Sequence, residues 1–170
     1  ADTVIVDQDA ELPVVTLSAD TITCLITFAD VSAAGAEADW LLQWTLPDGS
    51  TDTGIDIVTT QSGLHTIVVT DPSTDCQFID RIAVVLDTLS PSPIIAVSGS
   101  LSCTETQVNL SVLESITDGD EIVWTGPDGF SAVGAQVSVM AIGLYTVTVT
   151  SLDNGCSSAV SYLVERSGSG

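Results

Sequence analysis

The sequence contains one alternating segment twice. Residues 143–150 read Gly-Leu-Tyr-Thr-Val-Thr-Val-Thr, and residues 63–70 read Gly-Leu-His-Thr-Ile-Val-Val-Thr; subtracting 63 from 143 gives an offset of 80. Alternation of β-branched with other residues is typical of a strand that buries one face. Self-similarity at a fixed period indicates tandem modules, so we expect two copies of one unit.

Rare residue types keep the same phase. Pro13 matches Pro93, Trp44 matches Trp124 and Cys76 matches Cys156 at 80 positions, and Cys24 matches Cys103 at 79. We therefore predict module 1 at residues 13–87, a proline-containing linker at 88–92, module 2 at 93–166 and a flexible tail at 167–170.

The first residues fit the same phase. Val4-Ile5-Val6-Asp7 aligns with Val84-Val85-Leu86-Asp87, which closes module 1. Residues 1–12 are therefore interpreted as the tail of a preceding module plus a linker. The alternative is a donor strand that completes a neighbouring subunit by strand addition.

Strand and turn signals predict an all-β fold. Asp48-Gly49, Asp128-Gly129 and Asn154-Gly155 are turn dipeptides. The predicted strands lie near 13–18, 21–29, 40–46, 53–59, 64–70 and 77–86, and near 93–98, 101–113, 121–126, 134–140, 144–150 and 157–165. Short strands with regular turns and no amphipathic helix indicate an antiparallel β-sandwich in each module.

Charge excludes some partners. The formal net charge is −21, with Arg81 and Arg166 as the fixed cations and no lysine. Such a surface repels nucleic acid and anionic lipid. No apolar run is long enough to span a bilayer.

Module 2 resembles a known class of repeat. Trp124, the segment 143–150 and Asn154-Gly155-Cys156 are similar to the immunoglobulin-like or PKD-like repeats of secreted Bacteroidota surface proteins. Module 1 departs from the pattern, since His65 replaces the tyrosine and Thr74-Asp75 replaces Asn-Gly. The resemblance implies two tandem immunoglobulin-like sandwiches at the cell surface, in adhesin stalks or adhesive arrays. It also implies O-glycosylation at Asp-Thr motifs, with Thr3, Thr21 and Thr88 as candidates.

The four cysteines predict one disulfide per module, at separations of 52 residues for Cys24 with Cys76 and 53 for Cys103 with Cys156. In a plain immunoglobulin layout, however, these positions lie at opposite ends of the sandwich. Either the first cysteine of each pair lies further along the sandwich, towards its partner, than expected, or the strand order departs from that layout. Metal binding is the competing use, and the Cys-x-x-Cys spacing that favours it is absent.

Aromatic residues divide into core and surface candidates. Trp44, Trp124 and Tyr145 are predicted core anchors, because each lies on the inward phase of an alternating strand. His65 occupies the Tyr145 position and is interpreted as a structural histidine bonded to backbone. Trp40 matches Asp120 and is the candidate ligand-binding aromatic, with packing as the alternative.

Acidic residues suggest one metal hypothesis. Asp48, Asp87, Asp118, Asp120 and Glu121 are predicted near the junction of the modules, where Ca²⁺ would relieve their repulsion. The alternative is a solvated acidic surface without a cofactor.

These features predict a non-enzymatic structural repeat of an extracellular array, either an adhesin stalk or the building block of a filament. Its expected partners are neighbouring copies, in cis or head to tail by strand addition. The alternative is a carbohydrate- or surface-ligand-binding module that uses Trp40. No nucleophile constellation favours an enzyme, and no catalytic residue is predicted.

Overall fold

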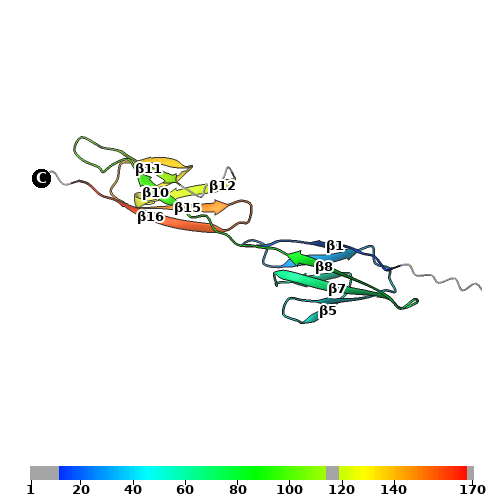
Figure 1. The fold of residues 1–170 in the computed structure, drawn as a ribbon. Coiled ribbons are helices and arrows are strands. Elements are labelled where there is room, and N and C mark those ends of the chain that lie inside the picture. The colour runs from blue at the N-terminus through cyan, green and yellow to red at the C-terminus, as the bar shows by residue number, and fades with distance from the viewer. Residues whose placement is uncertain (1–11, 114–118, 168–170) are drawn as a thin grey trace, which may run out of the picture. The chain divides into compact units, whose positions relative to one another are not determined.

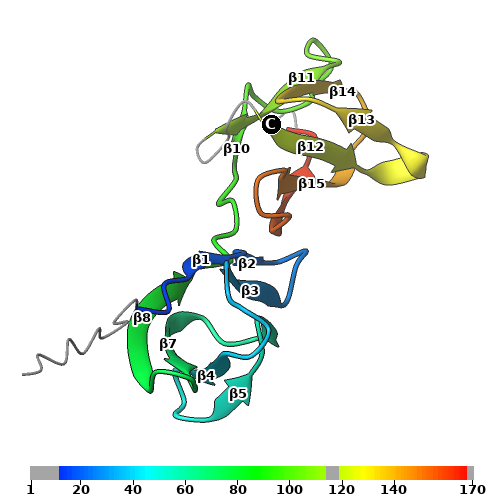
Figure 2. The ribbon, with the colours of Figure 1, turned by 90° about the vertical axis from the view of Figure 1, so that its right-hand side faces the viewer.

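The protein consists of two compact units, residues 1–87 and residues 88–170. The computed structural model describes residues 12–113 and 119–167. Figures 1 and 2 show that strands dominate both units. The predicted strand tail at residues 4–7 lies outside the described residues, as does most of the predicted segment 1–12.

Unit 1 is built from two antiparallel sheets and one short parallel pair. One sheet has the order β1-β3-β6 and the other β5-β4-β7-β8, while β2 pairs in parallel with β9. The strands are β1 (Thr16–Ala19), β2 (Ile22–Thr23), β3 (Ala29–Ala34), β4 (Leu41–Thr45), β5 (Thr51–Thr53), β6 (Asp56–Thr59), β7 (Gly63–Asp71), β8 (Cys76–Val84) and β9 (Leu86–Asp87).

Unit 2 repeats this arrangement. Its sheets have the orders β10-β11-β14 and β13-β12-β15-β16, and an isolated parallel bridge from Leu101 to Arg166 takes the place of the β2–β9 pair. Its elements are β10 (Ile94–Val97), β11 (Val108–Leu113), β12 (Asp120–Thr125), the short 3-10 turn η1 (Pro127–Gly129), β13 (Ser131–Val133), β14 (Gln136–Val139), β15 (Gly143–Ser151) and β16 (Ser157–Val164).

Each unit buries its own core. On β7 the residues His65, Ile67 and Val69 are fully buried, and on β15 Tyr145, Val147 and Val149 take the same positions. The alternation follows from the period of two in a strand, which places successive side chains on opposite faces. The large side chains of these cores include Trp44 in unit 1 and Trp124 in unit 2, both without solvent exposure.

The predicted strand 21–29 is wrong in its bounds. The structure has only two residues of β2, then a loop, and then β3 over Ala29–Ala34. The buried residues of β3 are Ala29, Val31 and Ala33. Two of these are small, so their alternation gives only a weak hydrophobic signal in the sequence. The predicted strand 101–113 is also wrong in its bounds, since β11 begins only at Val108.

The predicted strand 53–59 is divided between the two sheets. β5 pairs with β4, whereas β6 pairs with β3 in the opposite sheet. Gly54 lies between them with φ +127°, a backbone conformation that residues with a Cβ rarely adopt. Gly134 has φ +108° at the equivalent position between β13 and β14. The glycine lets the chain cross from one layer to the other.

Candidate functional site

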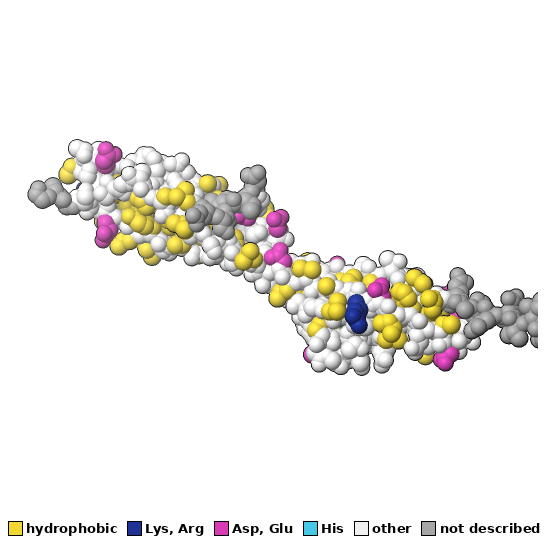
Figure 3. Space-filling model, viewed as in Figure 1, with side chains coloured by type: hydrophobic (Ala, Val, Ile, Leu, Met, Phe, Trp, Pro, Cys, Tyr) yellow, Lys and Arg dark blue, Asp and Glu magenta, His cyan; other side chains and the backbone are white. Residues whose placement is uncertain are grey.

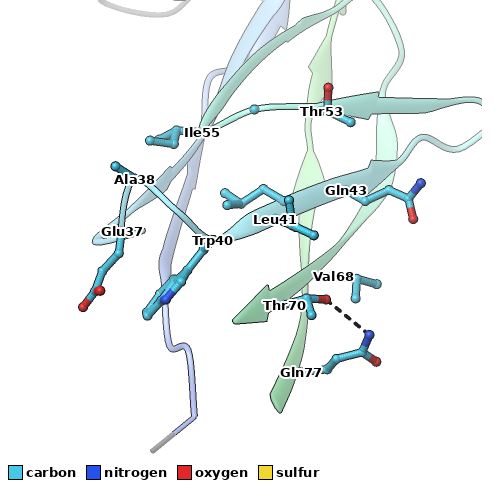
Figure 4. A pocket seen from close by; sticks show the side chains of 12 residues that line it. Glu37, Ala38, Trp40, Leu41, Gln43, Thr53, Ile55, Val68, Thr70 and Gln77 are labelled. Carbon is cyan, nitrogen blue, oxygen red and sulfur yellow. Dashed lines mark hydrogen bonds between the residues drawn. The ribbon is translucent and has the colours of Figure 1, made fainter. Parts of the chain in front are cut away.

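An open groove of about 700 Å³ lies on unit 1 beside Trp40. It is formed by the loop before β4, by β4 itself, by the β5–β6 crossing and by the outward faces of β7 and β8. Its lining includes Glu37, Trp40, Leu41, Ile55, Thr70 and Gln77. Figure 4 shows Trp40 and Glu37 pointing the same way from the loop before β4.

Strand register positions the polar wall of the groove. Leu41 is paired with Thr70, and Thr70 is paired with Gln77, so the three side chains stand in one row across the sheet. The Gln77 amide donates a hydrogen bond of 3.2 Å to the Thr70 hydroxyl, drawn in Figure 4. This bond fixes the orientation of the amide, whose carbonyl oxygen remains an acceptor.

Trp40 is half-buried and packs against the core cluster of unit 1. Its backbone N–H donates to the Glu37 carbonyl at 3.2 Å, which closes the turn that carries both residues. A supported indole in one groove with a carboxylate and an amide can stack on the apolar face of a sugar ring, while polar groups of the lining bond its hydroxyl groups. In unit 2 the Trp40 position is Asp120, so the aromatic is not repeated.

The predicted core anchors lie deep in the sandwiches. The Trp44 indole N–H donates to the Gly54 carbonyl at 3.0 Å, and the Trp124 indole N–H donates to the Gly134 carbonyl at 3.0 Å. The Tyr145 hydroxyl donates to the Ala141 carbonyl at 3.1 Å. Burial of the Tyr145 ring raises the pKa of its phenol above its ordinary value.

His65 has a structural environment. It is fully buried, and Nδ1 lies 3.2 Å from the Gly63 carbonyl while Nε2 lies 3.4 Å from the Thr59 hydroxyl. A carbonyl oxygen can only accept, so Nδ1 donates to Gly63. The contact with backbone matches the role expected from the sequence.

The predicted disulfides within each module are wrong. Cys24 and Cys156 are disulfide-bonded, while Cys76 and Cys103 are free. Thr23 on β2 pairs in parallel with Asp87 on β9, so Cys24 lies where the last strand ends, and Cys76 lies where β8 begins. The 11 residues from Cys76 to Asp87 span roughly 35 Å at the strand rise, whereas a disulfide needs Cα atoms within about 7 Å.

The acidic candidates do not form a described metal site. Within the described residues, no group of three or more His, Cys, Asp or Glu side chains could hold a metal ion. The Asp48 carboxylate accepts from the Ser50 backbone N–H at 2.9 Å and from the Gln61 amide at 2.9 Å, so it stabilises its own turn. Asp120 and Glu121 lie at the start of β12, Asp87 ends β9, and Asp118 lies outside the described residues.

The glycosylation candidates are at the surface where they are described. Thr21 and Thr88 are exposed, and Thr3 falls outside the described residues.

Figure 3 shows hydrophobic side chains spread over the visible face of each unit with acidic side chains among them. No helix in residues 12–113 and 119–167 is long and apolar enough to cross a membrane.

Sequence reasoning missed the role of Asn154. Its buried side chain donates to the Leu89 carbonyl at 3.0 Å and accepts from the Cys156 backbone N–H at 2.9 Å. It therefore ties the segment before β10 to the β15–β16 turn. The sequence signal was the Asn-Gly dipeptide, which indicated a turn but not the partner of the side chain.

Comparison with known proteins identifies the fold. No family model matches the chain, and no curated protein matches it in sequence. The three N-terminal domains of the bacteriophage RB49 highly immunogenic outer capsid protein (Hoc) align with a TM-score of 0.54 at 11% identity, over 90% of this chain. This chain spans 59% of that Hoc chain.

Two further solved structures are similar at lower scores. Murine CEACAM1b aligns with a TM-score of 0.43 at 11% identity, over 89% of this chain and 99% of that chain. The mouse nectin-like molecule 4 ectodomain (Ig1–Ig3) aligns with a TM-score of 0.37 at 13% identity, over 94% of this chain and 66% of that chain. The sheet orders of both units, together with the alignment to the Hoc domains, support an all-β protein with the immunoglobulin-like sandwich fold.

Proposed function

We propose that the chain is a non-enzymatic structural repeat of an extracellular surface array, serving as an adhesin stalk or as the building block of a filament. One observation carries this proposal. The residues that repeat between the two units are those that hold the sandwich together. The residues with the chemistry to bind a ligand differ between the units.

The repeated contacts are structural. The indole-to-glycine hydrogen bond is 3.0 Å in both units. A Cβ added to Gly63 would lie 3.3 Å from the Pro47 ring, and one added to Gly143 would press against the Pro127 ring. Both glycines have positive φ, +120° and +141°, so the turn before the long strand is built the same way twice.

The unrepeated positions include the ligand candidates. Trp40 corresponds to Asp120, and His65 corresponds to Tyr145. A chain selected for two identical binding sites would keep such residues in both copies. Duplication of the scaffold alone supports a role in spanning distance outside the cell.

Two features support an extracellular location. Cys24 and Cys156 are disulfide-bonded, and disulfides persist in oxidising compartments. The similar structures include an outer capsid protein and the ectodomain of a nectin-like molecule. The expected partners are further copies of the module, in cis or head to tail.

Immunogold electron microscopy of intact cells that produce the chain tests the proposal. We expect repeated label along surface stalks or extracellular filaments, without prior lysis. Label that becomes accessible only after lysis would refute the extracellular role. Measurable turnover of a panel of glycosides, esters and peptides would refute the non-enzymatic role.

The Trp40 groove supports a second candidate function, binding of a surface carbohydrate. Its volume falls in the range of small-ligand sites, roughly 300–1,000 Å³. The half-buried indole, the Glu37 carboxylate and the oriented Gln77 amide provide one stacking surface and two polar contacts. A single saccharide unit matches this set better than a nucleotide, because the net charge of −21 disfavours anionic ligands.

A glycan array followed by calorimetry tests the second candidate. For any glycan that binds, Trp40→Ala should weaken the affinity roughly tenfold, the loss expected when one stacking aromatic is removed. Val58→Ala is the matched control, because Val58 is 63% exposed and lies on β6, in the other sheet. An equal loss in both variants, or no bound glycan, would remove this candidate.

A further inference from the structure

Each unit carries one cysteine at each of its ends. In unit 1, Cys24 lies at the end where β9 finishes, and Cys76 lies at the opposite end, as the first residue of β8. In unit 2, Cys103 lies two residues after Leu101, which bridges Arg166 beyond the end of β16. Cys156 directly precedes β16, at the opposite end.

The repeat relates these cysteines in pairs. Cys24 and Cys103 are equivalent and lie where the last strand of a unit ends; we call this position the exit position. Cys76 and Cys156 are equivalent and lie where the last long strand begins; we call this position the entry position. Within a unit the two positions are too far apart to bond, since the 10 residues from Cys156 to Arg166 alone span roughly 33 Å.

Whether a cysteine is in a disulfide depends neither on the unit that carries it nor on whether it lies at an exit or an entry position. Cys24, an exit cysteine, and Cys156, an entry cysteine, are disulfide-bonded. Cys103, the other exit cysteine, and Cys76, the other entry cysteine, are free. Each kind of position is therefore found once as a disulfide and once as a thiol. Both positions are competent for disulfide formation, and neither free cysteine can reach a cysteine in its own unit.

We propose that Cys103 of one copy of the chain forms an intermolecular disulfide with Cys76 of the next copy, so that copies are linked covalently end to end. The partner is a second copy of this chain, and the bond joins an exit position to an entry position. This inference rests on the proposed function as a structural repeat and adds the residues and the bond that would join the copies.

The local structure at both free cysteines favours a thiol that is held in a fixed turn and can react with another copy of the chain. Cys103 is exposed, in a turn where the Ser102 hydroxyl accepts from the backbone N–H groups of Thr104 and Glu105 at 3.2 and 2.9 Å. Cys76 is half-buried, and its backbone N–H donates to the Thr74 hydroxyl at 3.4 Å. At the equivalent bonded position, the Cys156 N–H donates to Asn154. The side chain two residues before the cysteine thus holds the turn in both the free and the bonded case.

The bond requires an oxidant, which we take to be a small-molecule disulfide such as glutathione disulfide. The thiolate of one cysteine attacks the disulfide, forms a mixed disulfide and releases one equivalent of the small thiol. The thiolate of the second cysteine then attacks the protein sulfur of the mixed disulfide and releases the other equivalent. The two cysteine thiols are oxidised, the small disulfide is reduced to two thiols, and no other redox partner is needed.

A mixing experiment with two single variants tests the inference. Incubated with glutathione disulfide, the unaltered chain should give a ladder of covalent oligomers on non-reducing electrophoresis, and reduction should collapse the ladder. Cys76→Ser and Cys103→Ser, each incubated alone, should give no species above a dimer. An equimolar mixture, with one variant isotopically labelled, should give the mixed dimer in excess of random pairing, with Cys103 joined to Cys76 by peptide mapping.

Other outcomes would overturn the inference. These are an unaltered chain that stays monomeric under oxidation, a mixture that gives only the random share of mixed dimer, or cross-links that map to Cys76 with Cys76. Both substitutions leave Cys24 and Cys156 intact, and unchanged thermal melting controls for folding. Surface label in the immunogold experiment together with a monomeric oxidised chain would reject this linkage while leaving the proposed function in place.

Discussion

The two units fill one core position with different side chains. Tyr145 in unit 2 and His65 in unit 1 are both buried at the same place on the long central strand. A Cβ added to Gly126 would lie 2.5 Å from the Tyr145 ring, so glycine is needed there. The equivalent residue in unit 1 is Leu46, which packs against the core of that unit.

A second exchange accompanies the first. Phe130 packs edge-on against Tyr145 with ring centroids 5.3 Å apart, and its counterpart in unit 1 is Ser50. Unit 2 thus concentrates volume in two aromatic rings, whereas unit 1 shares it between histidine and leucine. The difference teaches that the same sandwich core can be filled by different side chains at equivalent positions.

The largest expected effect tests what the units have in common. Trp44→Ala and Trp124→Ala each remove a fully buried indole and its hydrogen bond, so each should cost about 3–5 kcal/mol of unfolding free energy in its own unit. Urea titration followed by hydrogen exchange and mass spectrometry reports each unit separately. Leu144→Ala is the control, because Leu144 is 56% exposed. A large loss in one unit and a negligible loss in the other would contradict the equivalence of the two cores.

The next effect tests the difference. Gly126→Leu places the side chain of unit 1 into unit 2, and the clash with Tyr145 should cost about 1–3 kcal/mol by overpacking. Adding Tyr145→His should restore part of this loss, because the smaller ring makes room for the leucine. Thermal melting of the single and double variants measures both steps. Additive losses in the double variant would show that the two positions are not coupled.

A smaller effect concerns the hydrogen bond that the Tyr145 hydroxyl donates. Tyr145→Phe removes the hydrogen bond to the Ala141 carbonyl and should cost about 0.5–1.5 kcal/mol. The pKa of the Tyr145 phenol is raised by burial in the folded state. The contribution of the protonated Tyr145 phenol to the free energy of unfolding is therefore fully present below the unfolded pKa of 10.0. It is lost as the pH rises through the folded pKa.

Melting of unit 2 between about pH 8 and about pH 11 measures this loss. The Tyr145→Phe variant should lack the part of the alkaline decrease that belongs to Tyr145. All other residues are the same in both proteins, so the difference between the two curves belongs to Tyr145. An identical alkaline decrease with and without Tyr145 would contradict the assignment.

The smallest effect concerns acid and belongs to unit 1. Hydrogen bonds from Ser50 and Ser73 hold the pKa values of Asp48 and Asp71, respectively, below 3.8. Stability from these groups is present above pH 3.8 and is lost as pH falls through their folded pKa values. Both carboxylates are exposed to solvent, so the effect is small.

Melting curves of unit 1 at about pH 7 and about pH 2 measure the acid effect. Asp48→Asn combined with Asp71→Asn should reduce the acid sensitivity of unit 1 and leave unit 2 unchanged. In unit 2 the Asp71 position is Ser151, which has no carboxylate to titrate. A variant as acid-sensitive as the unaltered chain would show that these turns do not contribute.

The candidate groove was only partly predictable. Trp40 stood out in the sequence because its repeat counterpart is Asp120, and it lies in the lining of the groove. Glu37 and Gln77 could not be assigned to the same place, because they lie 40 residues apart (77 minus 37) and only the pairing of Thr70 with Gln77 brings β8 to the groove. Cross-strand neighbours depend on register, which a single sequence does not display.

The sequence by itself determined the duplication, the all-β class, the buried tryptophans and the glycine turns. These follow from local periodicity and from residues that only one backbone conformation or environment suits. Only the tertiary structure decided which cysteines bond. In unit 1 the short strand before Cys24 pairs in parallel with β9, and in unit 2 Leu101, just before Cys103, bridges Arg166 in parallel. This non-local pairing places the two cysteines of a unit at opposite ends, beyond the reach of a disulfide.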